Sequence, residues 1–317
     1  MFKQIFKYIF TYKVINLFFK IYIKFIEILP KYSSSEKYWK LNTVNAPSNI
    51  FYNIKESIKH LNWRNSQYLN CAENMKYNNA HKKIVLDYGC GPGNGIINLI
   101  TKCKPKKIIA VDVSEKAINL ATKRAYLHRI KVDFIKINEN EKISSIKNNS
   151  IDVIKCDGVL HHIENTEHVL REFHRILKKN GKINCMVYNK KSIWYYLHAC
   201  YELKIRRGFL YDKTDDEAFK MSTDGFRCPI SKCYSEEEFK KLCKKNNFKA
   251  ELVDISVSKF ELGKLNLISE AISDERLDND KIDFLKKIRI KNNIPFYNNR
   301  VAGINAYFEL KKTGSFE

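Results

Sequence analysis

The sequence predicts an α/β fold in which a mostly parallel sheet carries helices on both faces. Short apolar runs alternate with amphipathic helical patterns through the middle of the chain, as expected for parallel strands joined by helical crossovers. The run 84–88 reads as a buried strand and leads into a glycine-rich turn and a helix. A second strand, 107–113, also carries an acid near its end, Asp112. Acids and glycines at strand ends place a candidate site at one edge of the sheet.

The composition limits the number of domains and indicates the kind of partner. The 317 residues suffice for one large domain with additions or two small ones, and 44% hydrophobic residues are ordinary for a protein with a core. Lys and Arg number 57 against 35 Asp and Glu, so the net charge of +22 favours anionic partners such as nucleic acid or acidic lipid. Abundant Lys, Asn and Ile also fit simple compositional drift in an AT-rich genome.

The nine cysteines are scattered and include no C-x-x-C pair, so they suggest neither a metal site nor a disulfide framework. Cys90 and Cys156 fall in expected core elements and are interpreted as packed thiols. This use of cysteine is typical of a reducing cytoplasm.

Residues 1–30 predict a basic amphipathic helix that ends at Pro30. Five lysines interrupt its apolar pattern and Glu27 is its only acid, so no uncharged run approaches the roughly 20 residues that span a bilayer. A secretory signal also fits poorly. The pattern suits a helix lying in the interface of an anionic membrane. A helix packed on its own domain or on a second subunit fits equally well.

The turn after the first strand carries glycine at positions 89, 91, 93 and 95. Glycine lets the backbone turn with positive φ and lets a ligand approach the main chain. The spacing is G-x-G-x-G, Asp87 stands two residues before the first glycine, and no Gly-Lys-Ser/Thr follows. A phosphate-binding P-loop is therefore not indicated.

Leu86-Asp87-Tyr88-Gly89-Cys90-Gly91-Pro92-Gly93 resembles motif I of class I S-adenosylmethionine (SAM)-dependent methyltransferases. The resemblance implies a Rossmann-like, seven-stranded sheet, SAM as cofactor and a ribose-binding role for Asp112, which could instead cap the next helix. It covers about 82–310 and implies a methyltransferase domain at 81–312. The cofactor-binding residues that it implies are Asp87, Gly89, Cys90, Gly91, Gly93, Asp112, Val113, Asn138, Glu139, Asp157 and Gly158.

Asn138 departs from the family, which usually places an acid after the third strand, here 132–137, to meet the adenine amino group. An asparagine oxygen can still accept that hydrogen bond. Glu139 and Asn140 are nearby alternatives.

The segment 150–162 resembles motif IV of the small-molecule branch, with a fourth strand followed by Leu-His-His. His161 and His162 could supply a base near neutral pH, or could tie the loop to the next helix. Tyr188, in the fifth strand at 182–189, is a third candidate catalytic group. The Asn/Asp-Pro-Pro-aromatic motif of amino-methylating members is missing.

Between these landmarks we expect a helix at 164–179, closed by Asn180-Gly181. After the fifth strand, an insertion at 190–233 lies at the ligand-binding face of the sheet and is interpreted as the acceptor-binding element. Its candidate substrate-binding residues, with one that follows directly, are Trp194, Tyr195, Asp224 and Tyr234. A stabilising flap without substrate contact is the alternative.

The segment 31–80 is expected to form a helical lid over the SAM pocket, with helical fragments at 49–61 and 65–75. Its candidate pocket-lining residues are Trp39, Tyr52, Trp63, Arg64 and Tyr68. Toward the C-terminus, Ser235 should cap a helix, and 246–259 resembles the junction between that helix and the sixth strand of the family. The segment 262–298 reads as a helical insertion. The last strand, 301–310, is expected to lie antiparallel at the sheet edge.

These features predict a SAM-dependent methyltransferase acting on a small-molecule or lipid-like acceptor. The chain looks most like the type 11 group, which includes quinone-biosynthesis enzymes. An RNA methyltransferase, favoured by charge, and a non-catalytic partner subunit with the SAM fold are the alternatives. We expect no metal, a cytoplasmic location with peripheral membrane contact, and nucleic acid as the less favoured partner.

Overall fold

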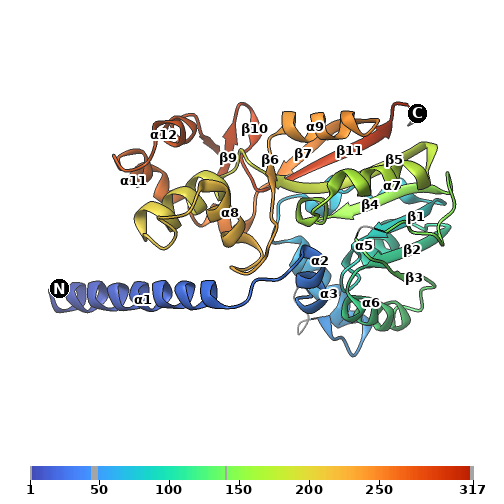
Figure 1. Ribbon diagram of the computed structural model, residues 1–317, viewed down its shortest axis with the longest axis horizontal. Helices are drawn as coiled ribbons and strands as arrows, with labels where there is room; N and C mark the ends of the chain where they lie inside the picture. Colours follow the sequence, from blue (N-terminus) through green and yellow to red (C-terminus); the bar gives the residue numbers. More distant parts are fainter. Residues whose placement is uncertain (1, 44–48, 140, 315–317) are drawn as a thin grey trace.

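The computed structural model describes residues 2–43, 49–139 and 141–314, and its centre is a large mixed sheet (Figure 1). Strands follow the order β3-β2-β1-β4-β5-β11-β7, and the short β6 pairs with β5. The neighbours from β3 to β5 run parallel, whereas β11 runs antiparallel to both β5 and β7. The strands are β1 (Ile84–Tyr88), β2 (Lys107–Asp112), β3 (Asp133–Lys136), β4 (Ile151–Asp157), β5 (Leu177–Asn189), β6 (Cys233–Tyr234), β7 (Phe248–Ser256) and β11 (Asn305–Lys312).

Successive side chains of β1 enter two different hydrophobic clusters, which shows that the sheet is buried on both faces. Val85 joins a cluster with α5 (Asn94–Lys102) and α6 (Glu115–Leu127). Leu86 joins the cluster that contains residues of α7 (Thr166–Ile176) and α9 (Glu236–Lys245). Both side chains are fully buried. The predicted Rossmann-like α/β fold is therefore confirmed, with the two-residue β6 as an eighth strand.

The structure corrects one predicted boundary and one predicted strand position. The helix expected to continue to Lys179 ends at Ile176, and β5 begins at Leu177, whose fully buried side chain joins the core. The last strand does not lie at the sheet edge, because β11 runs between β5 and β7. Tyr307 and Phe308 on β11 are both 2% exposed, so this strand is buried on both faces. A central position lets neighbours on both sides satisfy its backbone groups.

The segment 262–298 is only partly helical. Its helices are α10 (Lys259–Leu262), η5 (Leu265–Leu267), α11 (Ile268–Ile272) and α12 (Asn279–Lys286). A small antiparallel sheet of β8 (Arg289–Lys291), β9 (Ile294–Tyr297) and β10 (Arg300–Val301) follows. Asn292 and Asn293 connect its first two strands with φ of 50° and 60°. Two consecutive positive φ values suit a tight hairpin turn, and asparagine tolerates them.

The N-terminal region begins with α1 (Phe2–Ile28), which projects along one side of the molecule (Figure 1). The elements that follow it are α2 (Ser35–Leu41), α3 (Ile54–Asn65), α4 (Cys71–Asn74) and η2 (Tyr77–Ala80). Ser34 and Asn53 cap α2 and α3 through side-chain oxygens. Of the helical fragment expected at 65–75, only α4 forms beyond the end of α3. Within the described residues, no helix is both long and apolar enough to cross a membrane.

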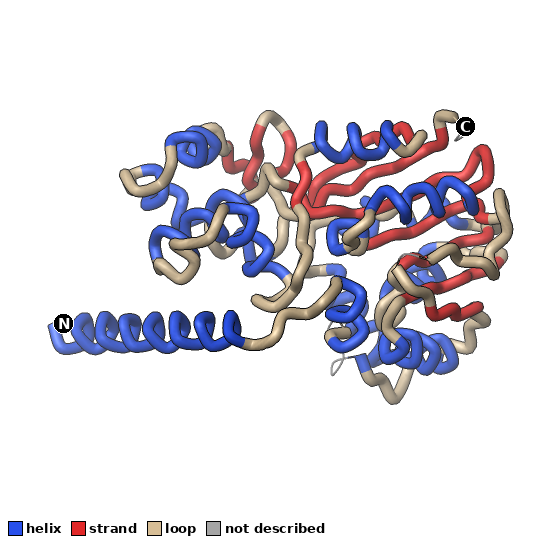
Figure 2. Tube along the Cα trace, in the orientation of Figure 1, coloured by secondary structure: helices blue, strands red, loops and turns tan. Residues whose placement is uncertain are grey.

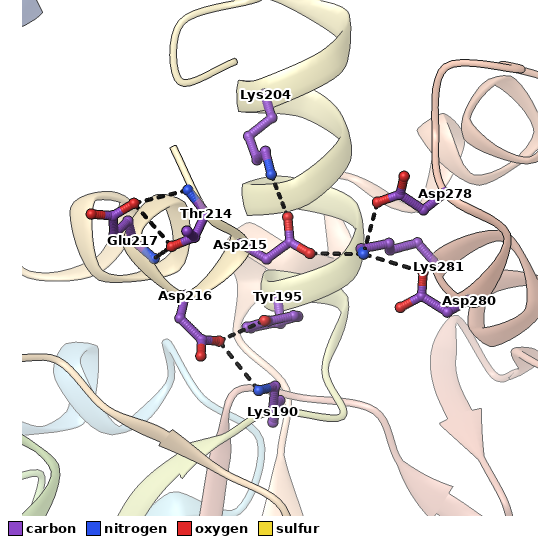
Figure 3. A network of polar contacts seen from close by, with 10 residues as sticks. All are labelled: Lys190, Tyr195, Lys204, Thr214, Asp215, Asp216, Glu217, Asp278, Asp280 and Lys281. Carbon is purple, nitrogen blue, oxygen red and sulfur yellow. Dashed lines mark hydrogen bonds and ion pairs between the residues drawn. The ribbon is translucent and has the colours of Figure 1, made fainter. Parts of the chain in front are cut away.

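The insertion after β5 contains the π-helix η4 (Trp194–Arg206) and α8 (Asp215–Thr223), which lie beyond the strand ends (Figure 2). Figure 3 shows the polar contacts that fix α8. Asp215 pairs with Lys204 of η4 and, at 2.8 Å, with Lys281 of α12. Asp216 accepts a hydrogen bond from the Tyr195 hydroxyl at 2.6 Å. A capping box between Thr214 and Glu217 starts the helix.

Candidate active site

A cleft of about 1070 Å³ empty volume, open to solvent, lies over the ends of β1, β2 and β4. The glycine turn forms its floor. Gly89, Gly91 and Gly93 have φ of +72°, +50° and +88°, so the tight turn uses conformations that other residues rarely adopt. A Cβ on Gly91 would meet no atom within 4 Å, because that backbone faces the open cleft. Gly93 serves instead as the N-cap of α5.

Asp112 ends β2 at the rim of this floor. Its Oδ2 accepts a hydrogen bond from the Gly91 amide and its Oδ1 accepts one from the Ser114 amide, both at 2.8 Å. Burial raises the pKa of this carboxyl, although backbone donors of Ser114, Gly91 and Val113 act to lower it. Ser114, rather than Asp112, caps α6. Each carboxylate oxygen has a further lone pair for a ligand hydroxyl, and Val113 beside it also lines the cleft.

Asp87 is buried under the turn, and its Oδ2 has no hydrogen-bond partner among the described residues. Burial, followed by the charges of Asp157 and Asp112, raises the pKa of Asp87 to about 7. A buried acceptor without a partner is unfavourable, so a ligand that brings an N–H donor would be stabilised here. Asp157 and Gly158 line the cleft at the end of β4, and Cys90 lines its floor.

Glu139, and not Asn138, reaches the cleft beyond β3. The side chain of Asn138 accepts a hydrogen bond from Lys40 at 3.4 Å. Glu139 is 7% exposed, and its Oε1 accepts a hydrogen bond from the Glu164 amide at 2.6 Å. Burial, more than nearby acids, raises the pKa of Glu139. The third alternative, Asn140, lies outside the described residues.

The N-terminal segment covers the cleft. Glu36 and Trp39 of α2 line it, and a Glu36 oxygen accepts a hydrogen bond from the Glu139 amide at 3.0 Å. Thr43 contacts Ser114 through their hydroxyls at 3.0 Å. Arg64 of α3 reaches Asp157 at 3.5 Å. Burial opposes the charge of Arg64, but Asp157 outweighs it and raises the pKa of the guanidinium.

The sequence identified only part of this cover. Trp39 and Arg64 line the cleft, whereas Tyr52 and Trp63 are 86% and 53% exposed and Tyr68 packs against core residues. Glu36, Thr43 and Ser114 were not expected to line it. Glu36 and Thr43 reach the cleft only when α2 folds over the ends of the strands, so no sequence motif marks them. Ser114 lies there because it follows β2 and caps α6.

His162 lines the far end of the cleft and forms a polar cluster with the insertion. Its Nδ1 lies 2.8 Å from the Ile230 carbonyl oxygen, and its Nε2 lies 3.4 Å from Oδ2 of Asp224. The same carboxylate accepts a hydrogen bond from the Tyr188 hydroxyl at 3.0 Å. The Tyr38 hydroxyl donates to the Asp224 carbonyl at 2.5 Å. The structure therefore brings His162, Tyr188 and Asp224 together.

His161 does not reach the cleft. It is fully buried, neither ring nitrogen has a partner among the described residues, and its ring stacks on Tyr188 with centroids 3.8 Å apart. Burial lowers the pKa of His161 well below its usual value, so the ring is neutral. Burial likewise raises the pKa of Tyr188 well above its usual value and keeps its hydroxyl protonated.

Three expected substrate-binding residues lie away from the cleft. Trp194 donates from Nε1 to Ser222 at 2.9 Å and packs against Phe260. Tyr195 is 4% exposed and points to Asp216 (Figure 3). Tyr234 lies in a separate groove beside α9. Of the four candidates associated with the insertion, only Asp224 contacts a residue that lines the cleft.

The fold and these strand-end acids define a class I SAM-dependent methyltransferase. The family model described as "methyltransferase domain" matches residues 79–270, so the chain belongs to that family. It is 28% identical over 106 residues to a ubiquinone biosynthesis O-methyltransferase of Rickettsia canadensis, a match that covers 33% of this chain and 42% of that one. A probable S-adenosylmethionine-dependent methyltransferase of Saccharomyces cerevisiae is 27% identical over 145 residues, covering 45% and 46%. The chain thus spans less than half the length of these relatives.

Two solved structures share the fold. A Haemonchus contortus phosphoethanolamine N-methyltransferase 2, in complex with phosphomonomethylethanolamine and S-adenosylhomocysteine, matches with a TM-score of 0.52 and 14% identity, covering 89% of this chain and 61% of that one. A Haloferax volcanii complex of the Trm112 activator with a methyltransferase matches with a TM-score of 0.51 and 14% identity, covering 81% and 93%. At such low identity these matches show the fold alone.

SAM is the cofactor of this class, and the residues of the cleft fit it. Asp87, with an unpartnered oxygen, would hold an amino group of the cofactor, and Asp112 would accept from its ribose hydroxyls. Glu139 lines the cleft and would be the acid near the adenine. The glycine turn leaves room for the cofactor to approach the backbone.

Proposed function

We propose that this chain transfers a methyl group from SAM to a proton-bearing nucleophile of a small-molecule or lipid-like acceptor, with His162 as the base. The observation that carries the proposal is the contact of His162 with Asp224 at the end of the cleft. SAM supplies an already activated methyl group, so the protein needs to align the acceptor, exclude water and remove a proton.

The hydrogen bond to Ile230 determines the tautomer of His162. A carbonyl oxygen can only accept, so Nδ1 carries the proton, and Nε2 of the neutral ring is an acceptor. Nε2 then faces a second acceptor, Oδ2 of Asp224, at 3.4 Å. A hydroxyl or amine placed beside the pair can donate its proton to Nε2. The nearby carboxylate stabilises the imidazolium that results.

Tyr188 and Tyr38 are positioning residues in this scheme. Tyr188 donates to the Asp224 carboxylate and Tyr38 donates to its main-chain carbonyl, so both hold Asp224 in place. The raised pKa of Tyr188 keeps its hydroxyl protonated at neutral pH, so the side chain is not available to accept a proton. Trp39 packs over His162, with ring centroids 4.8 Å apart, and covers this end of the cleft. Such a cover favours a compact reacting group over a nucleotide within folded RNA.

The test measures cofactor binding and turnover separately. The purified chain should bind SAM and S-adenosylhomocysteine with micromolar dissociation constants, about 7–8 kcal/mol. Incubation with isotope-labelled SAM and a fractionated extract of small metabolites and lipids should yield a labelled product that is heavier by one methylene. Comparing metabolites of a deletion strain with those of its parent identifies the acceptor. Labelled RNA in place of a small product would favour the RNA methyltransferase, and cofactor binding without any labelled product would favour a non-catalytic subunit.

We place this reaction in the cytoplasm, because nine scattered cysteines are typical of a reducing compartment. The acceptor would be either dissolved there or presented at the inner face of a membrane. Fractionating cells and detecting the chain with an antibody tests the location. Recovery from an oxidising compartment would contradict it.

A further inference from the structure

Helix α1 is fixed to the insertion by one side of its C-terminal half. Ile23 is 3% exposed, and the ring of Phe19 lies 4.5 Å from that of Phe209 and 5.7 Å from that of Phe226, measured between centroids. Glu27 pairs with Lys213 at 2.7 Å. These contacts hold the helix in a defined orientation relative to the body of the molecule.

The other side of this half presents large apolar side chains to solvent. Their exposed fractions are 59% for Leu17, 68% for Phe18, 55% for Ile21, 51% for Tyr22, 59% for Phe25 and 82% for Ile28. With about 100° between successive residues, the six occupy one arc of roughly 140°. A contiguous apolar face of this kind usually binds something. We call residues 17, 18, 21, 22, 25 and 28 the α1 face.

Charge distinguishes between two possible occupants of the α1 face, a second copy of the chain and an anionic membrane surface. Lys20 and Lys24 are exposed and border the arc on one side. Every copy of the chain carries a formal charge of +22, so two copies packed through this face would repel each other, whereas an anionic surface would attract each copy. Aromatic side chains and lysines around an apolar arc are also the composition of helices that lie in a membrane interface.

We propose that the α1 face binds an anionic membrane, with the helix lying along the surface and its apolar side chains in the head-group region. The lysines at the border would contact lipid phosphates, each strengthening binding by about fivefold. Helix α1 is packed on the insertion that carries Asp224. This attachment would therefore place the end of the cleft around His162, where we propose that the acceptor binds, near the membrane. The binding itself does not depend on the proposed catalytic activity.

The experiment is co-sedimentation of the full chain with vesicles of phosphatidylcholine alone or mixed with phosphatidylglycerol. The wild type should sediment with the anionic vesicles, less with the neutral ones, and less again at high salt. The double variant Phe18→Glu/Phe25→Glu should bind anionic vesicles at least about tenfold more weakly. Lys20→Gln/Lys24→Gln should bind less tightly and with a shallower salt dependence.

Tyr126→Glu is the matched control, because Tyr126 is 85% exposed on α6 and lies away from the α1 face. It should sediment like the wild type. Calorimetric binding of S-adenosylhomocysteine by every variant shows that the fold is intact, and it tests the cofactor site separately from the membrane.

Either of two results would overturn the proposal. Unchanged sedimentation of Phe18→Glu/Phe25→Glu would show that the α1 face does not contact lipid. A wild-type chain that stays in the supernatant, but forms a dimer that the same variant dissociates, would assign the face to a second copy.

Discussion

The end of the cleft around Asp87 and Asp112, which would hold SAM (the cofactor end), and the end around His162, where we propose that the acceptor binds (the acceptor end), are built in different ways. At the cofactor end, Asp87 and Asp112 belong to adjacent strands, and one of them bonds the glycine turn directly. At the other end, His162 follows β4 and Tyr188 lies in the neighbouring β5, and the insertion brings Asp224 to both side chains. A local strand–turn–helix unit can be placed from sequence. For a site assembled from distant segments, the sequence named His162, Tyr188 and Asp224 as candidates but not which of the candidates come together. Substitutions should therefore separate cofactor binding from turnover.

The largest effect is expected at the acceptor end. His162→Asn keeps a donor for the Ile230 carbonyl but removes the base, so turnover should fall by about 10²–10⁴-fold. Affinity for S-adenosylhomocysteine should stay within about threefold, or under 1 kcal/mol. Steady-state rates and calorimetry on the same preparation provide the comparison. If the variant lost cofactor affinity as much as turnover, the two ends of the cleft would have to be treated as one site.

At the cofactor end, Asp112→Ala removes the carboxylate that accepts from the Gly91 and Ser114 amides and that we expect to accept from the ribose hydroxyls. We expect SAM and S-adenosylhomocysteine to lose affinity by a similar factor of roughly 30–150, or about 2–3 kcal/mol, because they share the ribose. Titration calorimetry with both ligands measures this. Unchanged isotherms would remove Asp112 from the site.

The protonation of Asp87 links the cofactor end of the cleft to the free energy of unfolding. Its pKa of about 7 in the folded chain lies above the usual value of 3.8, so the folded state binds more protons than the unfolded state between these pH values. Stability of the cofactor-free protein should therefore fall as pH rises from about 4 to about 7. Asp87→Asn should remove this slope, stabilise the free protein at neutral pH by roughly 1–3 kcal/mol, and weaken SAM binding.

Thermal unfolding at several pH values checks the prediction for Asp87. Asp152→Asn is a control of opposite sign. The hydrogen bonds to Lys178 and to the Ile84 amide outweigh the effect of burial and lower the pKa of Asp152. The ionised Asp152 carboxylate stabilises the fold, and this contribution is lost as the pH falls, whereas that of Asp87 is lost as the pH rises. A parallel slope for wild type and Asp87→Asn would show that Asp87 is not the group responsible.

The smallest effect is expected inside the insertion, away from the cleft. Trp194→Phe keeps an aromatic ring against Phe260 and removes the hydrogen bond to Ser222, so unfolding should become easier by about 1 kcal/mol. Turnover and cofactor affinity should both stay within about threefold. Denaturant unfolding and steady-state rates measure these. A large loss of turnover alone would place Trp194 in the acceptor site after all.

The fold and the positions of the glycine turn and the strand-end acids could be predicted because their signals are local. The apolar run before Gly89, the positive φ values of the turn and the acid that ends β2 all depend on neighbours in sequence. Asn138 shows the limit of this reasoning. A shift of one residue after β3 decides that Glu139 enters the cleft, and only the packing of the loop against Glu36 and Glu164 fixes that shift.

The sequence by itself determined the class of fold, the glycine turn, the two acids at strand ends and the helical N-terminus, because backbone conformation and apolar period are properties of short segments. Only the tertiary structure decided which histidine faces the cleft. His161 and His162 are adjacent and chemically identical, but one is buried against Tyr188 and the other points to Asp224. The contacts that separate them come from residues far away in the chain, Tyr188 of β5 and Asp224 of the insertion, and these residues come together only when the chain folds.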